Sequence, residues 1–257
     1  MKEVGRLEFL PDEERLWSLV AEPLDDATAD SWFAYAGVGN PAGRLVKVDL
    51  LQMKRVGYLQ LSGKDVRGGI SLGSFAYFVT SAKPAVVMRC PIKEMFHGDT
   101  FHPLEVSLAL GEHNVQAVFA DNTNEHMLLG TYTQPARVVK LAVPAMTRSA
   151  SLLLPANGVM APRNEHVLLG TYTQPARVVK LAVPAMTRSA SLLLPLAHPE
   201  GHDIGDEMIY CGARWDKHAI FGTSTLPGRI IKVHIETLTH IKTIELSHGE
   251  DRAVSLV

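Results

Sequence analysis

Short runs in which apolar and polar residues alternate recur along the chain. In Arg44–Leu50, apolar residues stand at positions 46, 48 and 50, and polar residues stand at 47 and 49. A period of two indicates a β-strand that buries one of its faces. Other short strand-like runs lie at 33–36, 56–61 and 69–72, and segments rich in Gly, Asn and Pro, which favour turns, separate the runs. The pattern therefore predicts sheets of short strands.

A long segment of this pattern occurs twice. Residues 124–155 and 164–195 are identical except for Met127 and Val167, and they begin 40 residues apart. A repeat of this length is typical of solenoids, propellers and other arrays. Weaker copies begin at Phe33, Phe75 and His218. A helical solenoid is disfavoured because every unit combines β-branched runs with Pro or Gly.

The copies share fixed offsets. In four units a Gly is followed seven residues later by an Arg, the pairs being Gly37 and Arg44, Gly130 and Arg137, Gly170 and Arg177, and Gly222 and Arg229. The unit that begins at Phe75 has Val79 and Val86 at these places. Residues that recur in every repeat usually serve the repeat itself, so we predict structural roles for them. The alternative is a ring of arginines that binds an anionic partner.

These units resemble blades of the YVTN type of β-propeller repeat, a relative of WD40-like propellers. The resemblance rests on an aromatic residue followed by Gly-Thr-x-Thr-x-Pro-(Gly/Ala)-Arg and a β-branched run, which stands nearly intact at 221–233. Leu replaces the aromatic residue in 128–141 and 168–181. The resemblance covers most of residues 33–246 and implies an all-β propeller of four-stranded antiparallel blades, about five in number. It implies little about function, because propellers host many unrelated activities.

The repeats suggest one propeller-like domain over residues 1–257. Its units are expected near 16–61, 69–106, 115–155, 156–195 and 207–246, with leftover strands at 1–10 and 252–257. The leftovers are predicted because Met1–Leu7 matches Met53–Leu59, and Glu14–Val20 matches Asp251–Val257. Whether the units close into a ring stays open. The unit at 156–195 has only residues 156–164 for its first strand, and Pro162 removes a backbone donor there, so we expect a damaged or minimal inner strand.

Composition narrows the classes of function. The formal net charge of −2 gives no electrostatic basis for binding nucleic acid or an anionic membrane. No run of apolar residues is long enough for a membrane-spanning helix, and the first residues lack the apolar core of a signal peptide. Two cysteines, Cys90 and Cys211, cannot form a disulfide framework or a four-thiolate zinc site, and we expect both to be inert. The cellular compartment is not predicted.

Candidate chemistry is sparse. The densest cluster of possible metal ligands lies in a loop with Gly and Pro and contains His198, His202, Asp203 and Asp206. It lacks a known metal-site spacing, so we predict a solvated loop and neither a metal nor a cofactor. A second group, to which the same applies, contains His97, Asp99, His102 and Glu105. Trp17, Trp32 and Trp215 lie near the blade entrances, where they either pack between blades or form a recognition surface.

The sequence thus predicts a non-enzymatic repeat scaffold that binds a protein or glycan partner through the loops between blades. No catalytic residue is predicted, and the oligomeric state is not. One alternative is an enzyme similar to propeller lactonases and hydrolases, with Glu207 and His113 as the polar residues near a central channel. Another is a fragment of a larger propeller without a function of its own.

Overall fold

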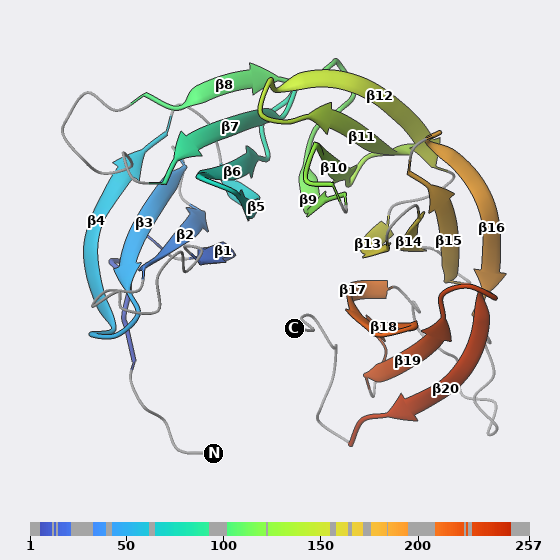
Figure 1. The fold of residues 1–257 in the computed structure, drawn as a ribbon. Helices are drawn as coiled ribbons and strands as arrows, with labels where there is room; N and C mark the ends of the chain where they lie inside the picture. The colour runs from blue at the N-terminus through green and yellow to red at the C-terminus, as the bar shows by residue number, and fades with distance from the viewer. Residues whose placement is uncertain are drawn as a thin grey trace. The chain divides into compact units, whose positions relative to one another are not determined.

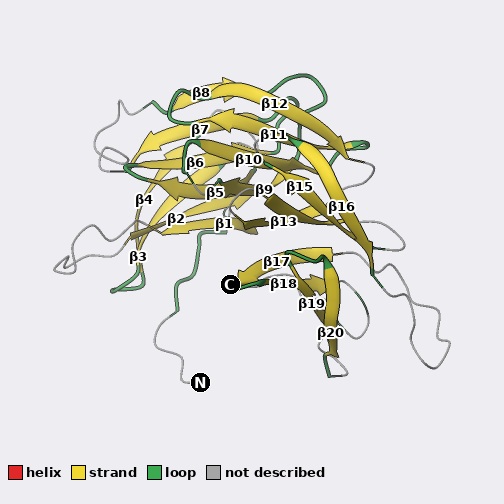
Figure 2. Cartoon of the chain, turned by 45° about the vertical axis from the view of Figure 1, so that its right-hand side comes forward, coloured by secondary structure: helices red, strands yellow, loops and turns green. Residues whose placement is uncertain are grey.

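The computed structural model describes residues 6–11, 13, 15–21, 33–39, 43–61, 65–92, 102–121, 123–154, 158–163, 166–171, 176–183, 185–194, 209–223, 225 and 228–247. All regular secondary structure in these residues is β-strand, as Figure 2 shows, which confirms the predicted all-β class. A search of the same residues finds no helix with the length and apolar character needed to cross a membrane.

The strands form five four-stranded sheets, and in each sheet four strands consecutive in the chain lie side by side in sequence order (Figure 1). Every strand pairing whose register is given is antiparallel. Short turns can therefore join neighbouring strands, as in a propeller blade. Backbone contacts divide the chain into two compact units, residues 1–118 and 119–257. The prediction of a single domain stays a prediction.

The first unit contains two sheets. The first sheet consists of β1 (Arg15–Ala21), β2 (Phe33–Gly39), β3 (Arg44–Asp49) and β4 (Lys54–Gln60). The second consists of β5 (Val66–Leu72), β6 (Phe75–Thr80), β7 (Val86–Pro91) and β8 (Leu104–Ser107). Their facing sides form one apolar core, in which Tyr35 and Leu45 of the first sheet join Phe78 and Met88 of the second. The alternating residues predicted from the sequence, Val46 and Val48, instead belong to a second apolar cluster with Ala36 and Val38. Strand β3 therefore buries both of its faces and not only the predicted one.

Three sheets follow, the first of which begins at the boundary between the units. The third sheet consists of β9 (Val115–Ala120), β10 (His126–Thr131), β11 (Ala136–Ala142) and β12 (Thr147–Leu154). The fourth consists of β13 (Gly158–Arg163), β14 (His166–Thr171), β15 (Arg177–Ala182) and β16 (Thr187–Leu193). The fifth consists of β17 (Ile209–Trp215), β18 (His218–Thr223), β19 (Arg229–His234) and β20 (Thr239–Glu245). In the second unit, Leu168 and Val178 pack against Phe221 and Val233 of the last sheet.

The short segment at 156–164 forms a better strand than the sequence suggested. Residues Gly158–Arg163 form β13, which pairs with β14 along its whole length, and Pro162 lies opposite Val167. Because β13 is the first strand of its sheet, only one of its edges needs to pair, so the missing N–H of a proline is tolerated there.

The leftover strands predicted at 1–10 and 252–257 stay predictions, because only residues 6–10 of them lie within the described part of the chain. Residues 6–10 form no strand, although Leu7 and Phe9 pack on the apolar cluster of Ala36, Val38, Val46 and Val48 in the first sheet. The predicted strand at 252–257 lies outside the described residues.

The recurrent glycines lie inside strands rather than in the turns that follow them. Gly37 lies in β2 and Gly170 lies in β14. A Cβ atom on Gly37 would come 2.7 Å from Cγ1 of Val66, and one on Gly170 would come 2.8 Å from Cβ of Ile209. Glycine is therefore needed where the first strand of the next sheet comes close.

Candidate functional site

The recurrent arginines begin, or nearly begin, the third strand of each sheet. Arg44, Arg177 and Arg229 are the first residues of β3, β15 and β19, and Arg137 is the second residue of β11. A threonine hydroxyl at the end of the second strand accepts the backbone N–H of this residue: Thr131 from Arg137 at 2.8 Å, Thr171 from Arg177 at 2.8 Å, and Thr223 from Arg229 at 3.1 Å. In the second sheet Thr80 accepts the N–H of Val86 in the same way. The Gly-Thr…Arg pattern thus closes the turn between the two strands.

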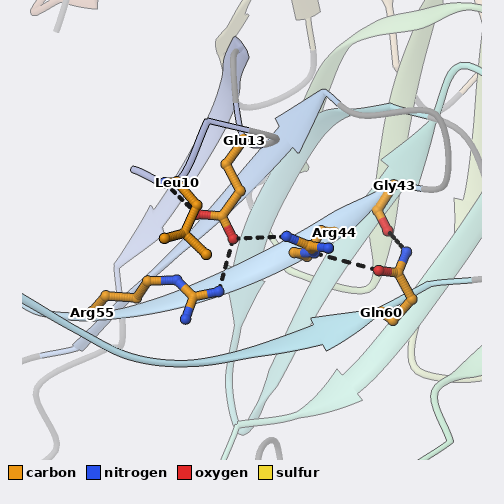
Figure 3. Close-up of polar contacts among 6 residues, drawn as sticks. All are labelled: Leu10, Glu13, Gly43, Arg44, Arg55 and Gln60. Carbon is orange, nitrogen blue, oxygen red and sulfur yellow. Dashed lines mark hydrogen bonds and ion pairs between the residues drawn. The ribbon is translucent and has the colours of Figure 1, made fainter. Parts of the chain in front are cut away.

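The first sheet has valine at this threonine position, and its arginine has a different set of partners (Figure 3). The Arg44 Nη1 atom donates to Oε1 of Glu13 at 3.1 Å, and Nη2 of Arg55 donates to the same oxygen at 2.8 Å. The other oxygen, Oε2, accepts the Leu10 N–H at 3.2 Å. Glu13 is the residue that the sequence analysis missed, because a run of acidic residues before a strand resembles a solvated turn.

The electrostatics of this cluster hold Glu13 ionised. Burial raises the pKa of the Glu13 carboxyl, but the hydrogen bonds from Arg55, the Leu10 N–H and Arg44 outweigh burial, so the pKa lies below its ordinary value. The Glu13 side chain has no exposed surface. Both guanidinium groups also lie over the Tyr58 ring, at 4.6 Å for Arg44 and 5.0 Å for Arg55. The cluster fixes the segment before β1 onto the first sheet.

A second cluster lies where β1 and β5 begin. The register of β1 against β2 shifts between Leu16 and Ser18, so that Trp17 is an extra residue. The register of β5 against β6 shifts between Val66 and Gly68, which makes Arg67 the extra residue there. Such bulges often re-aim a side chain near a functional site. Here they bring the Arg67 guanidinium to 3.8 Å from the centre of the Trp17 ring.

The surroundings of the Trp17–Arg67 pair are partly charged and partly apolar. Arg67 Nη2 forms an ion pair with Asp65 Oδ2 at 3.2 Å. The Trp17 side chain lies so close to Gly39 that a Cβ there would be 3.1 Å from its Cδ1 atom. Trp17 is nevertheless 39 % exposed, and its strand neighbours Leu16 and Leu19 are 52 % and 59 % exposed. The pair, with these two leucines, is called the inner-strand patch below.

Few of the remaining candidates lie within the described part of the chain. His198, His202, Asp203, Asp206 and Glu207 lie outside the described residues, as do His97 and Asp99. His102 and Glu105 are exposed. Within the described ranges, no three His, Cys, Asp or Glu side chains are close enough together to hold a metal ion.

Two of the candidate catalytic groups, His113 and Cys90, lie in the described part of the chain. His113 precedes β9 and lies outside any strand. Burial, and to a smaller extent the Glu105 carboxylate, raises the pKa of the Cys90 thiol to about 12, so this cysteine is protonated and unreactive at neutral pH. The Cys211 side chain is not among those described.

Comparisons with known proteins support the fold. No family model matches the chain, and no curated protein sequence matches it. Among solved structures, a chain of the mitotic checkpoint complex is similar, with a TM-score of 0.65 and 9 % identity over 86 % of this chain. A chain of a nidogen/laminin complex is also similar, with a TM-score of 0.60 and 11 % identity over 92 % of this chain.

The protein described here spans 63 % of the checkpoint-complex chain and 82 % of the nidogen/laminin chain. Both solved structures contain propellers, and the five antiparallel four-stranded sheets agree with that architecture, so the predicted propeller fold is confirmed. The YVTN type itself is not confirmed. At identities this low, the likeness shows the fold alone.

Proposed function

We propose that this protein is a non-enzymatic scaffold that binds a protein partner through the inner-strand patch. The observation that carries the proposal is the stacked pair of bulged residues, with Trp17 39 % exposed beside Arg67. Tryptophan and arginine are the residue types most enriched among energetic hot spots of protein interfaces. The neighbouring leucines, Leu16 and Leu19, would supply apolar area around that centre.

Two further points support a protein partner. The similar solved chains come from the mitotic checkpoint complex and from a nidogen/laminin complex, which are both protein assemblies. Furthermore, Trp17 is the third residue of β1 and Arg67 is the second residue of β5, so both lie close to the connections that lead into the first strands of their sheets. Such connections commonly carry function because a rigid scaffold positions them.

The test is a selection with a peptide display library on the intact chain, followed by binding measurements on the selected peptides. We expect Trp17→Ala to weaken binding by roughly tenfold or more, because truncating a hot-spot residue costs about 2 kcal/mol or more. Arg67→Gln should weaken it as well. The matched control is Tyr132→Ala, since Tyr132 is 38 % exposed and lies in the second unit.

Equal binding of the selected peptides to the Trp17→Ala variant and the intact sequence would refute the proposal. A glycan array, probed with the same proteins, separates the two partner classes. Binding to a glycan that is lost in Trp17→Ala, without any peptide binding, would show that the patch recognises a sugar instead.

A further inference from the structure

The segment from Leu7 to Glu13 lies on the first sheet without being one of its strands. Leu7 and Phe9 cover part of the apolar cluster of Ala36, Val38, Val46 and Val48. The sheet itself consists of β1 to β4, and residues 6–10 form no strand. Side chains therefore hold most of this segment in place, together with a turn in which the Glu13 N–H donates to the Leu10 carbonyl at 2.8 Å.

The two arginines that receive Glu13 are positioned by groups other than Glu13. Nε of Arg44 donates to Oε1 of Gln60 at 3.4 Å, and Nε2 of Gln60 donates in turn to the Gly43 carbonyl at 2.7 Å (Figure 3). Both guanidinium groups also lie over Tyr58. Gln60 and Tyr58 thus hold Arg44 toward the Glu13 carboxylate, whereas Arg55 is held there, apart from Glu13, by its stacking on Tyr58.

The anion site formed by the two arginines has donor capacity that Glu13 does not use. The Arg55 Nε atom is buried and has no hydrogen-bond partner among the described residues. Glu13 presents only Oε1 to the arginines, because its Oε2 accepts the Leu10 N–H. A partner carboxylate with both oxygens free could engage Nε and Nη2 of Arg55 together, in the two-pronged geometry that arginine favours.

We propose that residues 7–13 are an internal ligand on this face, and that a segment of a protein partner binds there in their place. The partner segment would carry two apolar residues two positions apart and a carboxylate four positions after the second, as Leu7, Phe9 and Glu13 do. This docking face is defined by the apolar cluster with Arg44 and Arg55. It is separate from the inner-strand patch and does not depend on the proposed function.

Because the internal ligand is tethered, it competes at a high effective concentration, in the millimolar range for short connections. A partner therefore binds the intact chain weakly and gains affinity when residues 7–13 are released. The probe is a fluorescein-labelled peptide with the sequence of residues 4–14. The release variant is the full chain carrying Leu7→Ser and Phe9→Ser, with its β-structure checked by circular dichroism.

Fluorescence anisotropy should show that the release variant binds this peptide at least about tenfold more tightly than the unmodified chain does. Replacing the peptide's glutamate at position 13 by glutamine should weaken binding by about tenfold or more, since it removes one partner of a buried ion pair. Adding Arg55→Gln to the release variant should have a similar effect. Lys54→Gln removes the same charge from an exposed neighbouring position and should have none.

Three results would overturn the inference. The release variant could bind the peptide no more tightly than the unmodified chain, or the glutamate and glutamine peptides could bind equally well. The third result is that Lys54→Gln weakens peptide binding as much as Arg55→Gln does. Light scattering on the release variant adds a fourth. If this variant forms dimers that the peptide dissociates, the occupant is a second copy of this chain rather than a partner. Trp17→Ala should leave peptide binding unchanged, so this test can fail or succeed independently of the proposed function.

Discussion

The two copies of the repeated sequence, residues 124–155 and 164–195, differ at one position and fold with the same strand register. His126 lies opposite Ala142, and His166 lies opposite Ala182. The outer pairing shifts at Lys140/Leu141 in one copy and at Lys180/Leu181 in the other. Local sequence therefore determines strand pairing and even the position of an irregularity, independently of what surrounds the sheet.

The same residues nevertheless have different environments. Arg137 is half-buried and Arg177 is exposed. Lys140 is buried, whereas Nζ of Lys180 donates to the Glu236 carbonyl at 3.1 Å. The sheet packed beside each copy differs, since β10 lies next to β13 and β14 lies next to β17. Side-chain burial is thus a property of neighbouring sheets, which the repeat alone does not specify.

The largest expected effect on the free energy of unfolding comes from core substitutions, and it should be similar in the two copies. Leu141 and Leu181 are at most 1 % exposed, so Leu141→Ala and Leu181→Ala should each reduce the free energy of unfolding by about 2–5 kcal/mol. Chemical denaturation measures both values. The exposed pair Leu153→Ala and Leu193→Ala serves as the control and should cost about 0.5 kcal/mol or less. A core substitution that costs no more than the controls would show that its copy is loosely packed.

A smaller effect is expected where the second copy meets the last sheet. Gly170→Ala would place a Cβ 2.8 Å from Cβ and Cδ1 of Ile209, so we expect a loss of about 1–3 kcal/mol from overpacking. Thermal unfolding of the single variant gives the cost. Combining it with Ile209→Ala, which removes Cγ2 and Cδ1 of the clashing side chain, should cost less than the sum of the two single changes. Additive losses in the double variant would contradict a steric cause.

The sequence predicted most of the strands because their apolar faces alternate locally. The run Arg44–Leu50 became β3, Arg44–Asp49, and the repeat located its equivalents. It could not predict the bulges at Trp17 and Arg67, because each bulge lies near the start of its strand, where too few residues precede it to reveal the change of phase in the alternation. Glu13 was missed for another reason. Its partner Arg55 is distant in sequence, and Glu13 is buried only because the two segments come into contact in the fold.

The next prediction concerns a residue outside the repeated block. Oδ2 of Asp121 lies 2.8 Å from Nδ1 of His126, whereas the position 40 residues later is Ala161. Burial raises the pKa of Asp121, but hydrogen bonds from Thr123 and His126 outweigh it, so the pKa lies below the ordinary 3.8. The ionised form therefore stabilises the fold above about pH 4, and this contribution is lost as the pH falls through the lowered pKa.

Asp121→Asn should therefore cost about 1–2 kcal/mol at pH 7, toward the low end of the range of about 1.5–3 kcal/mol for hydrogen bonds to charged groups, because the asparagine amide oxygen can still accept. It should also reduce the loss of stability on acidification below about pH 4. Denaturation at a series of pH values measures both effects. Glu125→Gln, at an exposed position nearby, is the control, and an equal effect of the two substitutions would exclude a specific role for Asp121.

The smallest expected effect on stability concerns one serine that both copies contain, and its sign should differ between the copies. Oγ of Ser151 is buried and has no hydrogen-bond partner among the described residues, whereas Oγ of Ser191 accepts from Nη2 of Arg188 at 2.7 Å. Ser151→Ala removes an unsatisfied buried hydroxyl, so it should leave stability unchanged or raise it by up to about 1 kcal/mol. Ser191→Ala loses an exposed hydrogen bond and should lower stability by about 0.5 kcal/mol or less. Parallel denaturation of both variants measures the sign of this difference, and equal changes would mean that the two environments are energetically the same despite their different burial.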